Sequence, residues 1–460
     1  MAQRFDLAVI GGGPGGYVAA IRAAQLGLRV ALVEKEQLGG VCLNRGCIPT
    51  KALLASAGLL EAVKRAKEFG VTVDGVRADV PAMFRRKDEV VARLRGGVEM
   101  LLKKRKVTVY SGVGSLRAPG DVSVDGPDGE VAIECDRVIL ATGSTPIVPD
   151  AFPFDGRVVV TTREALESSD LPPDVLIIGA GAVGCEFAGF YSSLGLSVTL
   201  VEMLPDILQG EDPSAVRLLK AAMKKKGVDV RTGTRVESIE IDGDSARTTL
   251  ADGTSVETGR VLLAMGRGPD SGGSGIPAAG IEVERRAVVV NEKMETSLPG
   301  VYAIGDLVGG WLLAHVASRE GIVAASNAAG RDTAMNYRVV PRCTFTRPEI
   351  ASVGLTEKEA GESGIELSSG RFSFAASGKA LAEGEEQGFV KILCGAAGGR
   401  VVGGVVVGPH ASDLIHEVAL AVEAELSFDR LAGMIHAHPT LAESVMEAAE
   451  AVEGLSIHSG

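Results

Sequence analysis

Apolar runs alternate with glycine clusters at the beginning of the chain. Residues 5–10 form an apolar run that predicts a buried strand, and residues 28–33 form a second one that ends at Glu34. Between the two strands, the apolar periodicity predicts a helix from about Tyr17 to Leu26, which Gly27 ends. A strand, a helix and a second strand in this order form one α/β unit.

The turn between the first strand and this helix carries glycines at a fixed spacing. Gly11, Gly13 and Gly16 form a G-x-G-x-x-G pattern. The first glycine permits a tight turn, the second lets a pyrophosphate approach the backbone, and the third allows close packing of helix on strand. The pyrophosphate would lie at the helix N-terminus, and Glu34 would accept the ribose hydroxyls. A plain glycine turn is the alternative, but the strands, helix and acid together favour a dinucleotide site.

The same pattern returns in the middle of the chain. A predicted strand at 175–178 leads into Gly179, Gly181 and Gly184, a helix is expected over 185–194, and a strand over 197–201 ends at Glu202. The same number of residues separates the first glycine from the acid in both units, so the chain contains two related dinucleotide-binding domains. Glu202 would repel a ribose 2′-phosphate, and no basic residue follows it at once, which favours NAD over NADP.

The remaining segments predict a less regular architecture. Residues 52–105 are expected to be mostly helical, and three short apolar runs between 107 and 133 indicate an antiparallel meander, followed by a buried strand at 138–140. In the last third, we expect three strands of one mixed sheet at 350–353, 389–393 and 401–407. Two helices are expected after them, at 411–425 and 441–452.

Cys42 and Cys47 lie five residues apart, just before an apolar helical pattern that Pro49 can open. Cys47 is thus expected at a helix N-terminus, where the dipole stabilises a thiolate. A regular helix would hold the two sulfurs beyond disulfide reach, so a bridge needs a distortion, which Gly46 permits. Three interpretations compete: unrelated buried thiols, a metal site that lacks a second cysteine pair, and a redox disulfide. Two dinucleotide units beside the pair favour electron transfer between nucleotides and a disulfide.

Two further groups are candidates for chemistry. Asp306 follows a predicted strand and could accept a hydroxyl from the ribityl chain of a flavin, or it could be an ordinary turn residue. His436 and His438 precede Glu443 near the C-terminus. They could form a structural pair or ligate a metal, but His438 as a base with Glu443 orienting its ring fits acid–base chemistry.

Composition limits the classes of protein that remain. A chain of 460 residues with 46% hydrophobic residues predicts several globular domains. A net charge of −12 argues against nucleic acid as a partner, and no apolar run is expected to span a bilayer. The first strand begins without a signal peptide, which predicts a cytoplasmic protein. Cys135, Cys185, Cys343 and Cys394 are isolated and are expected to be buried fillers.

Together these motifs identify a resemblance that extends over essentially the whole chain. The sequence resembles the class I pyridine nucleotide–disulfide oxidoreductases, and within them the enzymes that oxidise dihydrolipoamide. The matching pieces are both glycine patterns, Gly-Gly-Val-Cys-Leu-Asn-Arg-Gly-Cys-Ile-Pro-Thr-Lys at 39–51, Gly305-Asp306, Leu313-Ala314-His315 and His-Ala-His-Pro-Thr at 436–440. After the second Ala-x-Gly the chain departs from the pattern of the family, because a glycine-rich loop follows at 271–275.

The resemblance implies an α/β fold with two Rossmann-like dinucleotide-binding domains and a C-terminal α+β dimerisation domain. The implied division is 1–149 for FAD, 150–269 for NAD, 270–338 for a central domain that completes the FAD site, and 339–460 for the dimer interface. It further implies a homodimer that oxidises protein-bound dihydrolipoamide with NAD, and partners that bear lipoyl groups in 2-oxo acid dehydrogenase or glycine cleavage complexes. Reduction of another disulfide and a mainly structural flavin-bearing role are the alternatives.

The resemblance also assigns roles to single residues. Cys42 would exchange with substrate, Cys47 would face the flavin, Lys51 would pair with Glu186 near the flavin ring, and His438 with Glu443 would supply the base from the other subunit. The implied FAD contacts are Gly11, Gly13, Gly16, Glu34, Lys51, Gly114, Thr142, Gly143, Asp306 and Ala314. The implied NAD contacts are Gly179, Gly181, Gly184, Glu186, Glu202, Val236 and Gly266. No metal ligand is expected.

Overall fold

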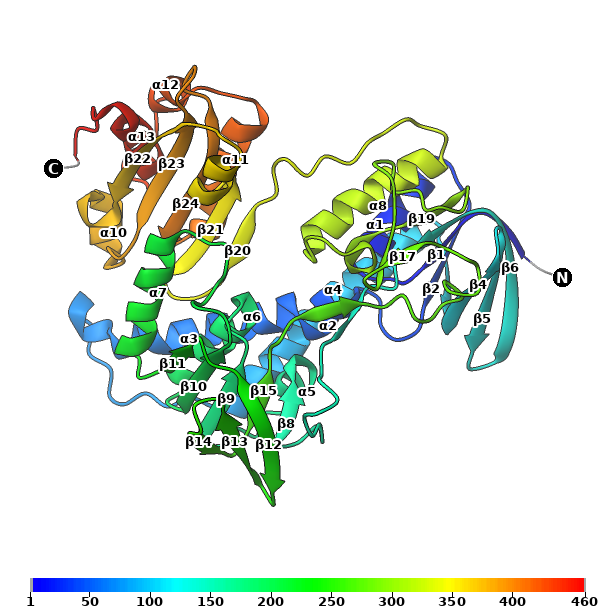
Figure 1. Cartoon of the computed structure of the whole chain (residues 1–460), viewed down its shortest axis with the longest axis horizontal. Coiled ribbons are helices and arrows are strands. Elements are labelled where there is room, and N and C mark those ends of the chain that lie inside the picture. The colour runs from blue at the N-terminus through cyan, green and yellow to red at the C-terminus, as the bar shows by residue number, and fades with distance from the viewer. Residues whose placement is uncertain (1–2, 459–460) are drawn as a thin grey trace.

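The first sheet of the protein combines a parallel part with an antiparallel part. The computed structural model describes residues 3–458 and is shown in Figure 1. The strands run in the order β3-β2-β1-β6-β5-β4, and β19 pairs with β6 on the parallel side. The elements of this sheet and its first helix are β1 (Gln3–Ile10), α1 (Pro14–Gln25), β2 (Val30–Glu34), β3 (Thr108–Ser111), β4 (Val113–Ala118), β5 (Asp121–Gly126), β6 (Gly129–Leu140) and β19 (Val301–Ala303).

The meander differs from the prediction in two ways. The strand expected to begin at 107 does not join it, because β3 pairs parallel with β2 and extends the dinucleotide sheet. The strands expected at 131–133 and 138–140 are one strand, β6, whose first residues, 129–134, pair antiparallel with β5 and whose residues 133–140 pair parallel with β1. Its buried end, Val138–Leu140, lies in the core of the sheet, whereas most of its beginning is exposed.

Helices cover this sheet and connect it to the rest of the chain. They are α2 (Gly40–Arg45), α3 (Cys47–Lys64), η1 (Ala66–Phe69), α4 (Val80–Lys104) and α8 (Ala314–Ala328). Gly40–Lys64 is long and apolar enough to meet a length and hydropathy test for a membrane span, which the core helix of a water-soluble protein also meets. Here α3 packs against α4 and α6, so its apolar residues have partners inside the protein.

Two glycines bring α1 and α8 into close contact. A Cβ on Gly321 would lie 2.5 Å from the carbonyl oxygen of Gly15, and a Cβ on Gly15 would lie 3.0 Å from that of Ala317. Only the absence of side chains lets the two backbones approach this closely. In Figure 1 the two helices lie side by side over the sheet.

The second sheet resembles the parallel part of the first sheet. Its strands run β11-β10-β9-β15-β8, all parallel, with an antiparallel sheet β12-β13-β14 beside them. The internal repeat that the glycine patterns predict is therefore present in the fold. Its elements are β8 (Val159–Thr161), α5 (Thr162–Glu167), β9 (Asp174–Ile178), α6 (Ala182–Ser193), β10 (Ser197–Glu202), α7 (Pro213–Lys225), β11 (Asp229–Thr232), β12 (Val236–Asp242), β13 (Ser245–Leu250), β14 (Ser255–Thr258) and β15 (Val261–Leu263).

A short antiparallel ladder joins the two units. It pairs β7 (Ser144–Pro146) with β16 (Arg267–Pro269), the segments that follow the last parallel strand of each unit. The glycine-rich loop comes next and packs on the first unit, where the N–H of Leu116 donates to the carbonyl of Ser274 over 2.9 Å. A Cβ on Gly275 would overlap the Leu116 carbonyl, and Gly275 has φ +76°, so glycine is needed there. The short elements that follow are β17 (Val283–Glu284), β18 (Ala287–Val288) and η2 (Gly305–Val308).

The last domain is built on a five-stranded sheet in the order β20-β21-β24-β23-β22. All its pairs are antiparallel, so the prediction of a mixed sheet is wrong, and the outer strands β20 and β22 are additions to the three predicted. The elements are β20 (Arg342–Thr344), β21 (Glu349–Gly354), α9 (Glu357–Glu362), β22 (Leu367–Ser373), η3 (Phe374–Ala376), α10 (Gly378–Glu383), β23 (Phe389–Gly395), β24 (Val401–Gly408), α11 (Ala411–Glu423), α12 (Phe428–Ala432), α13 (Glu443–Glu450) and η4 (Ala451–Glu453).

Candidate redox site

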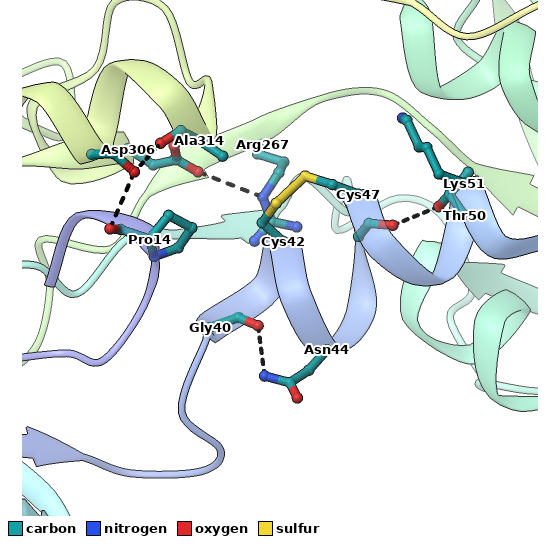
Figure 2. Close-up of a disulfide and its surroundings, with 12 residues drawn as sticks. Pro14, Gly40, Cys42, Asn44, Cys47, Thr50, Lys51, Arg267, Asp306 and Ala314 are labelled. Atoms are coloured by element: carbon teal, nitrogen blue, oxygen red, sulfur yellow. Dashed lines mark hydrogen bonds and ion pairs between the residues drawn. A yellow bond between two sulfur atoms is a disulfide. The ribbon is translucent and has the colours of Figure 1, made fainter. Parts of the chain in front are cut away.

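Cys42 and Cys47 form a disulfide where α2 gives way to α3 (Figure 2). The two Cα atoms are 4.6 Å apart, because the helix is interrupted at Gly46, which has φ −145° and ψ −107°. A Cβ on Gly46 would lie 3.1 Å from the carbonyl oxygen of Val41 and 3.3 Å from the Cα of Cys42. The distortion expected at Gly46 is thus the feature that brings the cysteines into disulfide range. Of the three interpretations of the pair, the disulfide is the one that the structure contains.

The other four cysteines are unpaired in the part of the chain that the structure describes. Cys135, Cys185 and Cys394 are buried, as expected, whereas Cys343 is half-buried. Burial raises the pKa of Cys135 to about 11 and that of Cys394 to about 12, which disfavours the reactive thiolate. Among residues 3–458, no group of three or more His, Cys, Asp or Glu side chains is placed to hold a metal ion.

An ion pair with one buried partner follows the disulfide by one helical turn. Lys51, on α3, places Nζ 2.8 and 3.0 Å from the two carboxylate oxygens of Glu186, which is 3% exposed on α6. Phe345 contacts both partners: its N–H donates to Glu186 over 3.0 Å, and Lys51 Nζ lies 4.4 Å from the centroid of its ring. The pair connects the disulfide helix with the second dinucleotide unit and the last domain. Phe345 carries no local sequence signal, since it follows a short strand far along the chain.

The first glycine turn has the geometry of an anion site. Gly11 has φ +107°, and a Cβ there would overlap the carbonyl of Ala141; a Cβ on Gly16 would overlap the carbonyl of Gly11. Gly13 is the N-cap of α1, so no side chain caps the first N–H groups of this helix. The N–H of Gly12 donates to Glu34 over 2.7 Å. Burial of Glu34 raises the pKa of its carboxyl, against the opposing effect of that hydrogen bond.

The second glycine turn has the same geometry. Gly179 has φ +101° and a Cβ on Gly184 would overlap its carbonyl, while Gly181 is an N-cap without a side chain. Glu202 accepts from the N–H of Ala180 over 2.8 Å and from that of Leu204 over 2.9 Å. In both units, free N–H groups at a helix N-terminus and a fixed carboxylate at the neighbouring strand end suit the pyrophosphate and the ribose of a dinucleotide.

The other predicted contact residues of the first unit come from segments that follow the first glycine turn in the chain. A Cβ on Gly114 would lie 2.9 Å from Ile10 and 3.1 Å from Val33, so a bare backbone lies over the ends of β1 and β2. Thr142 donates from its hydroxyl to the carbonyl of Asp270 over 2.9 Å, and Ala314 begins α8. In the second unit, Val236 begins β12, and Gly266 lies shortly after β15. Gly143 and Gly266 both have positive φ.

Asp306 faces a polar cluster that sequence reasoning did not assign. Ser144 donates from its hydroxyl to Asp306 over 2.5 Å, and Arg267 donates from Nε to the same hydroxyl oxygen over 2.7 Å. Arg267 Nε lies 4.0 Å from the carboxylate of Asp306, and burial lowers the pKa of its guanidinium. Figure 2 shows Arg267 between Asp306 and the disulfide. The sequence shows that Arg267 directly follows the second Ala-x-Gly, but it does not show its neighbours. The β7–β16 ladder brings Arg267 to the first unit.

His438 and Glu443 lie together at the other end of the molecule. Nδ1 of His438 is 2.9 Å from Glu443, and the N–H of Thr440 donates to the second carboxylate oxygen over 2.8 Å. Burial acts to raise the pKa of the Glu443 carboxyl, but these two hydrogen bonds outweigh it and hold that pKa below its usual value. The His438 side chain is 79% exposed, so Nε2 is open to a reactant. In Figure 1, α13 lies far from α2, so this pair does not reach the disulfide of its own chain.

His436 belongs to a different contact. Its Nε2 is 2.7 Å from Glu417, and its Nδ1 is 2.9 Å from the carbonyl of Met434. The side chain is only 3% exposed, whereas that of His438 is open. The two histidines therefore hold two different carboxylates, which fits a structural role for His436 and leaves His438 free for chemistry.

Comparisons with known proteins agree over the full chain. Residues 5–321 match the family model described as pyridine nucleotide-disulphide oxidoreductase, and residues 340–449 match its dimerisation domain. The chain is 44% identical over 462 residues to the dihydrolipoyl dehydrogenase of Thermus scotoductus, with 99% of each chain covered. It is 43% identical over 450 residues to that of Chlamydia pneumoniae, with 98% of this chain and 97% of the relative covered.

Solved structures show the same similarity in three dimensions. LpdA from Mycobacterium tuberculosis superposes with a TM-score of 0.91 at 30% identity, covering 97% of this chain and 99% of that one. The HOCl-induced flavoprotein disulfide reductase RclA from Escherichia coli superposes with a TM-score of 0.87 at 26% identity, with the same coverage.

Reduction of the Cys42–Cys47 disulfide should release two thiols. When the untreated protein is unfolded, a thiol reagent should detect the four unpaired cysteines, and six after prior reduction. Without unfolding, the buried thiols should react slowly, because burial raises the pKa of their thiol groups. The Cys42→Ser variant is the control and should give five thiols with or without reductant. Six thiols in the untreated protein would show that the bridge is absent.

Proposed function

This chain belongs to the pyridine nucleotide–disulphide oxidoreductases, and from that premise we propose that it oxidises protein-bound dihydrolipoamide to lipoamide and reduces NAD⁺ to NADH. The observation that carries the proposal is the Cys42–Cys47 disulfide at a helix break, in a chain similar over its whole length to dihydrolipoyl dehydrogenases. The family uses FAD and NAD, and the two glycine turns fit these two dinucleotides.

The residues that would hold FAD surround the first turn. Gly11, Gly13 and Gly16 would admit the pyrophosphate at α1, Glu34 would accept ribose hydroxyls, and Asp306 would accept a hydroxyl of the ribityl chain. The remaining FAD contacts that we propose are Lys51, Gly114, Thr142, Gly143 and Ala314. The proposed FAD domain comprises 1–149 and is completed by 270–338, a division supported by the pairing of β19 with β6.

The residues that would hold NAD surround the second turn, in a proposed domain of 150–269. Gly179, Gly181 and Gly184 would admit the pyrophosphate, and Glu202 would bind the ribose. Glu186, Val236 and Gly266 complete the proposed set. Bound FAD would supply the two-electron redox chemistry that links the cysteine pair to NAD⁺.

The thiol chemistry can be written with the residues of the chain. His438 accepts a proton at Nε2 from one thiol of dihydrolipoamide, and the thiolate attacks Sγ of Cys42. The Cys42–Cys47 bond breaks, so that Cys47 leaves as a thiolate and a mixed disulfide remains on Cys42. The second substrate thiol attacks the substrate sulfur of the mixed disulfide, the bond from that sulfur to Cys42 breaks, and the proton of the attacking thiol passes to Cys42. Lipoamide leaves oxidised, and both cysteines are reduced.

The surrounding charges suit this sequence of steps. Cys47 begins α3, where the helix dipole stabilises its thiolate. The ammonium of Lys51 lies one turn further along the same helix, held by Glu186. At the other end, Glu443 accepts from Nδ1 of His438, which directs Nε2 outward as the proton acceptor. These contacts support the role that we propose for each group.

Glu443 and His438 would serve the disulfide of the other chain. The match to a dimerisation domain places this protein among homodimers, and we propose 339–460 as the interface domain. Because His438 is exposed and pairs with Glu443 at the start of α13, which lies far from α2 in Figure 1, the base of each site would come from the partner subunit.

The partners that we propose are proteins that carry lipoyl groups, in a 2-oxo acid dehydrogenase or glycine cleavage complex of the cytoplasm. A disulfide reductase acting on another substrate is the alternative, since RclA shares the fold. Glutathione reductases prefer NADPH, and Glu202 opposes the 2′-phosphate of that cofactor.

The purified holoenzyme should reduce NAD⁺ with dihydrolipoamide and should not reduce NADP⁺ with glutathione. Stopped-flow absorbance should show the flavin band bleaching with dihydrolipoamide, because its dithiol can close a ring and release both cysteines. The Cys42→Ser protein is the control and should lose turnover by at least about a thousandfold, because no exchange thiol remains. Faster bleaching by glutathione than by dihydrolipoamide would contradict the proposal.

NAD should be preferred over NADP because of Glu202. Its carboxylate is fixed by two backbone N–H groups, accepts ribose hydroxyls and repels a 2′-phosphate. Glu202→Arg should shift the ratio of kcat/KM toward NADP by roughly tenfold or more, because it removes the repulsion of the 2′-phosphate and adds a partner for it. A tenfold shift corresponds to about 1.4 kcal/mol.

Glu202→Gln is the matched control, because it removes the charge and keeps an acceptor. It should shift the ratio of kcat/KM less than Glu202→Arg does. Equal use of both cofactors by the unchanged enzyme would refute this account of the preference.

The shared site predicts recovery of activity in mixed dimers. Cys47→Ser and His438→Ala homodimers should each be nearly inactive, because every site lacks a thiol or a base. In a heterodimer, one site receives Cys47 from one chain and His438 from the other, and so is complete. Random pairing of equal amounts makes half the dimers mixed, so about a quarter of the normal activity should return.

Each variant unfolded and refolded alone is the control, and mass spectrometry should verify that heterodimers form. If each chain built its own site, neither chain would hold both residues, and mixing would restore nothing. Absence of recovery in verified heterodimers would reject the shared site.

A further inference from the structure

Glu320 is a buried carboxylate that none of the steps above uses. It lies within α8, is 2% exposed, and both of its oxygens accept a hydrogen bond. One accepts from the N–H of Gly305 over 2.6 Å, and the other accepts from the hydroxyl of Tyr337 over 2.7 Å. A buried carboxylate is costly, so its retention at this point needs a reason.

The bond to Gly305 fixes the turn that precedes Asp306. Gly305 has φ +71°, and a Cβ there would lie 3.3 Å from Cβ of Ala317 on α8. The next residue is Asp306, whose carboxylate accepts from Ser144. The backbone N–H that Glu320 binds is therefore one residue from the carboxylate at the candidate flavin site.

The helix that carries Glu320 is itself fixed to the first glycine turn. Gly15 and Gly321 allow α1 and α8 to touch, and Ser318 donates to the carbonyl of Pro14 over 3.3 Å. Figure 2 shows Pro14, Ala314 and Asp306 next to one another. Through α8, Glu320 sets the Asp306 turn at a fixed place relative to the N-terminus of α1.

We propose that Glu320 is a positioning residue of the flavin site, which holds the Gly305–Asp306 turn on α8 so that Asp306 meets the dinucleotide bound at α1. The inference rests on the proposed function, because it takes the ligand of the first unit to be FAD. Glu320 does not touch the dinucleotide. Its effect is on where Asp306 lies, and so on how tightly FAD is retained.

Two substitutions separate the hydrogen bond from the charge. Glu320→Gln keeps an oxygen for the N–H of Gly305 and offers an N–H to the oxygen of Tyr337. Glu320→Ala removes both bonds and leaves the N–H of Gly305 without its acceptor. Burial raises the pKa of the Glu320 carboxyl, as does the nearby charge of Asp306, against the lowering effect of the hydrogen bonds from Tyr337 and Gly305. The Gln variant should thus retain the turn and the Ala variant should lose it.

The experiment measures FAD release from the purified holoenzymes by the rise of flavin fluorescence on dilution, beside the thermal unfolding midpoint by circular dichroism. Glu320→Ala should raise the FAD dissociation constant at least tenfold, and Glu320→Gln and Tyr337→Phe should remain within threefold of the unchanged protein. The KM for NAD should stay the same in all three, because the second unit is untouched.

Glu447→Ala is the matched control. Glu447 is 3% exposed on α13 and accepts from Ser456 and from His458, so its loss removes an equally buried and hydrogen-bonded carboxylate from another domain. It should lower the unfolding midpoint without raising FAD release. If Glu320→Ala does not fold, Glu320→Asp provides the test, because its shorter side chain keeps the charge but cannot reach Gly305, and it should raise release likewise.

The proposal is overturned if Glu320→Ala, or Glu320→Asp in its place, releases FAD like the unchanged protein. It is also overturned if Glu320→Gln loses FAD as readily as Glu320→Ala, or if Glu447→Ala raises release equally. A purified protein that carries no flavin would instead overturn the proposed function, so the two failures are distinguishable.

Discussion

The structure depends on the interruption of one helix at Gly46. Because this residue has no Cβ, α2 can end against the first turn of α3, and Cys42 comes within bonding reach of Cys47. An uninterrupted helix would keep the same two residues on different faces. Other elements attach to this point: α4 and α6 pack against α3, and the Lys51–Glu186 pair connects it to the second unit.

The duplication provides two similar binding geometries with different surroundings. In both units a glycine N-cap leaves helix N–H groups open, and a carboxylate at a strand end is held by backbone N–H groups. The contacts around them differ. Arg267 and Ser144 join Asp306 beside the first turn, where the β7–β16 ladder brings the segments after both parallel sheets together. Similar folds can therefore serve different nucleotides, because specificity resides in side chains added around a shared backbone.

The last domain holds an exposed histidine paired with a carboxylate, away from the disulfide of its own chain. Glu443 holds one nitrogen of His438 and leaves the other exposed, at a distance from α2. The same domain also supports the disulfide of its own chain, because Phe345 contacts both Lys51 and Glu186. One domain thus supports the disulfide helix of its own chain and presents a separate histidine–carboxylate pair to its surface.

The sequence by itself determined the local features of this protein. Glycine spacing located both turns, since a backbone that needs positive φ or close approach requires glycine, and apolar runs located the strands that follow. Motif resemblance assigned Cys42, Cys47 and His438, and the structure forms the disulfide. Tertiary structure decided what depends on distant segments: the antiparallel order of the last sheet, the continuity of β6, and the partners Arg267 and Phe345. Strand order and side-chain neighbours come from packing between separate segments of the chain, such as Phe345 and Glu186, which are 159 residues apart in the sequence, and no local pattern encodes that packing.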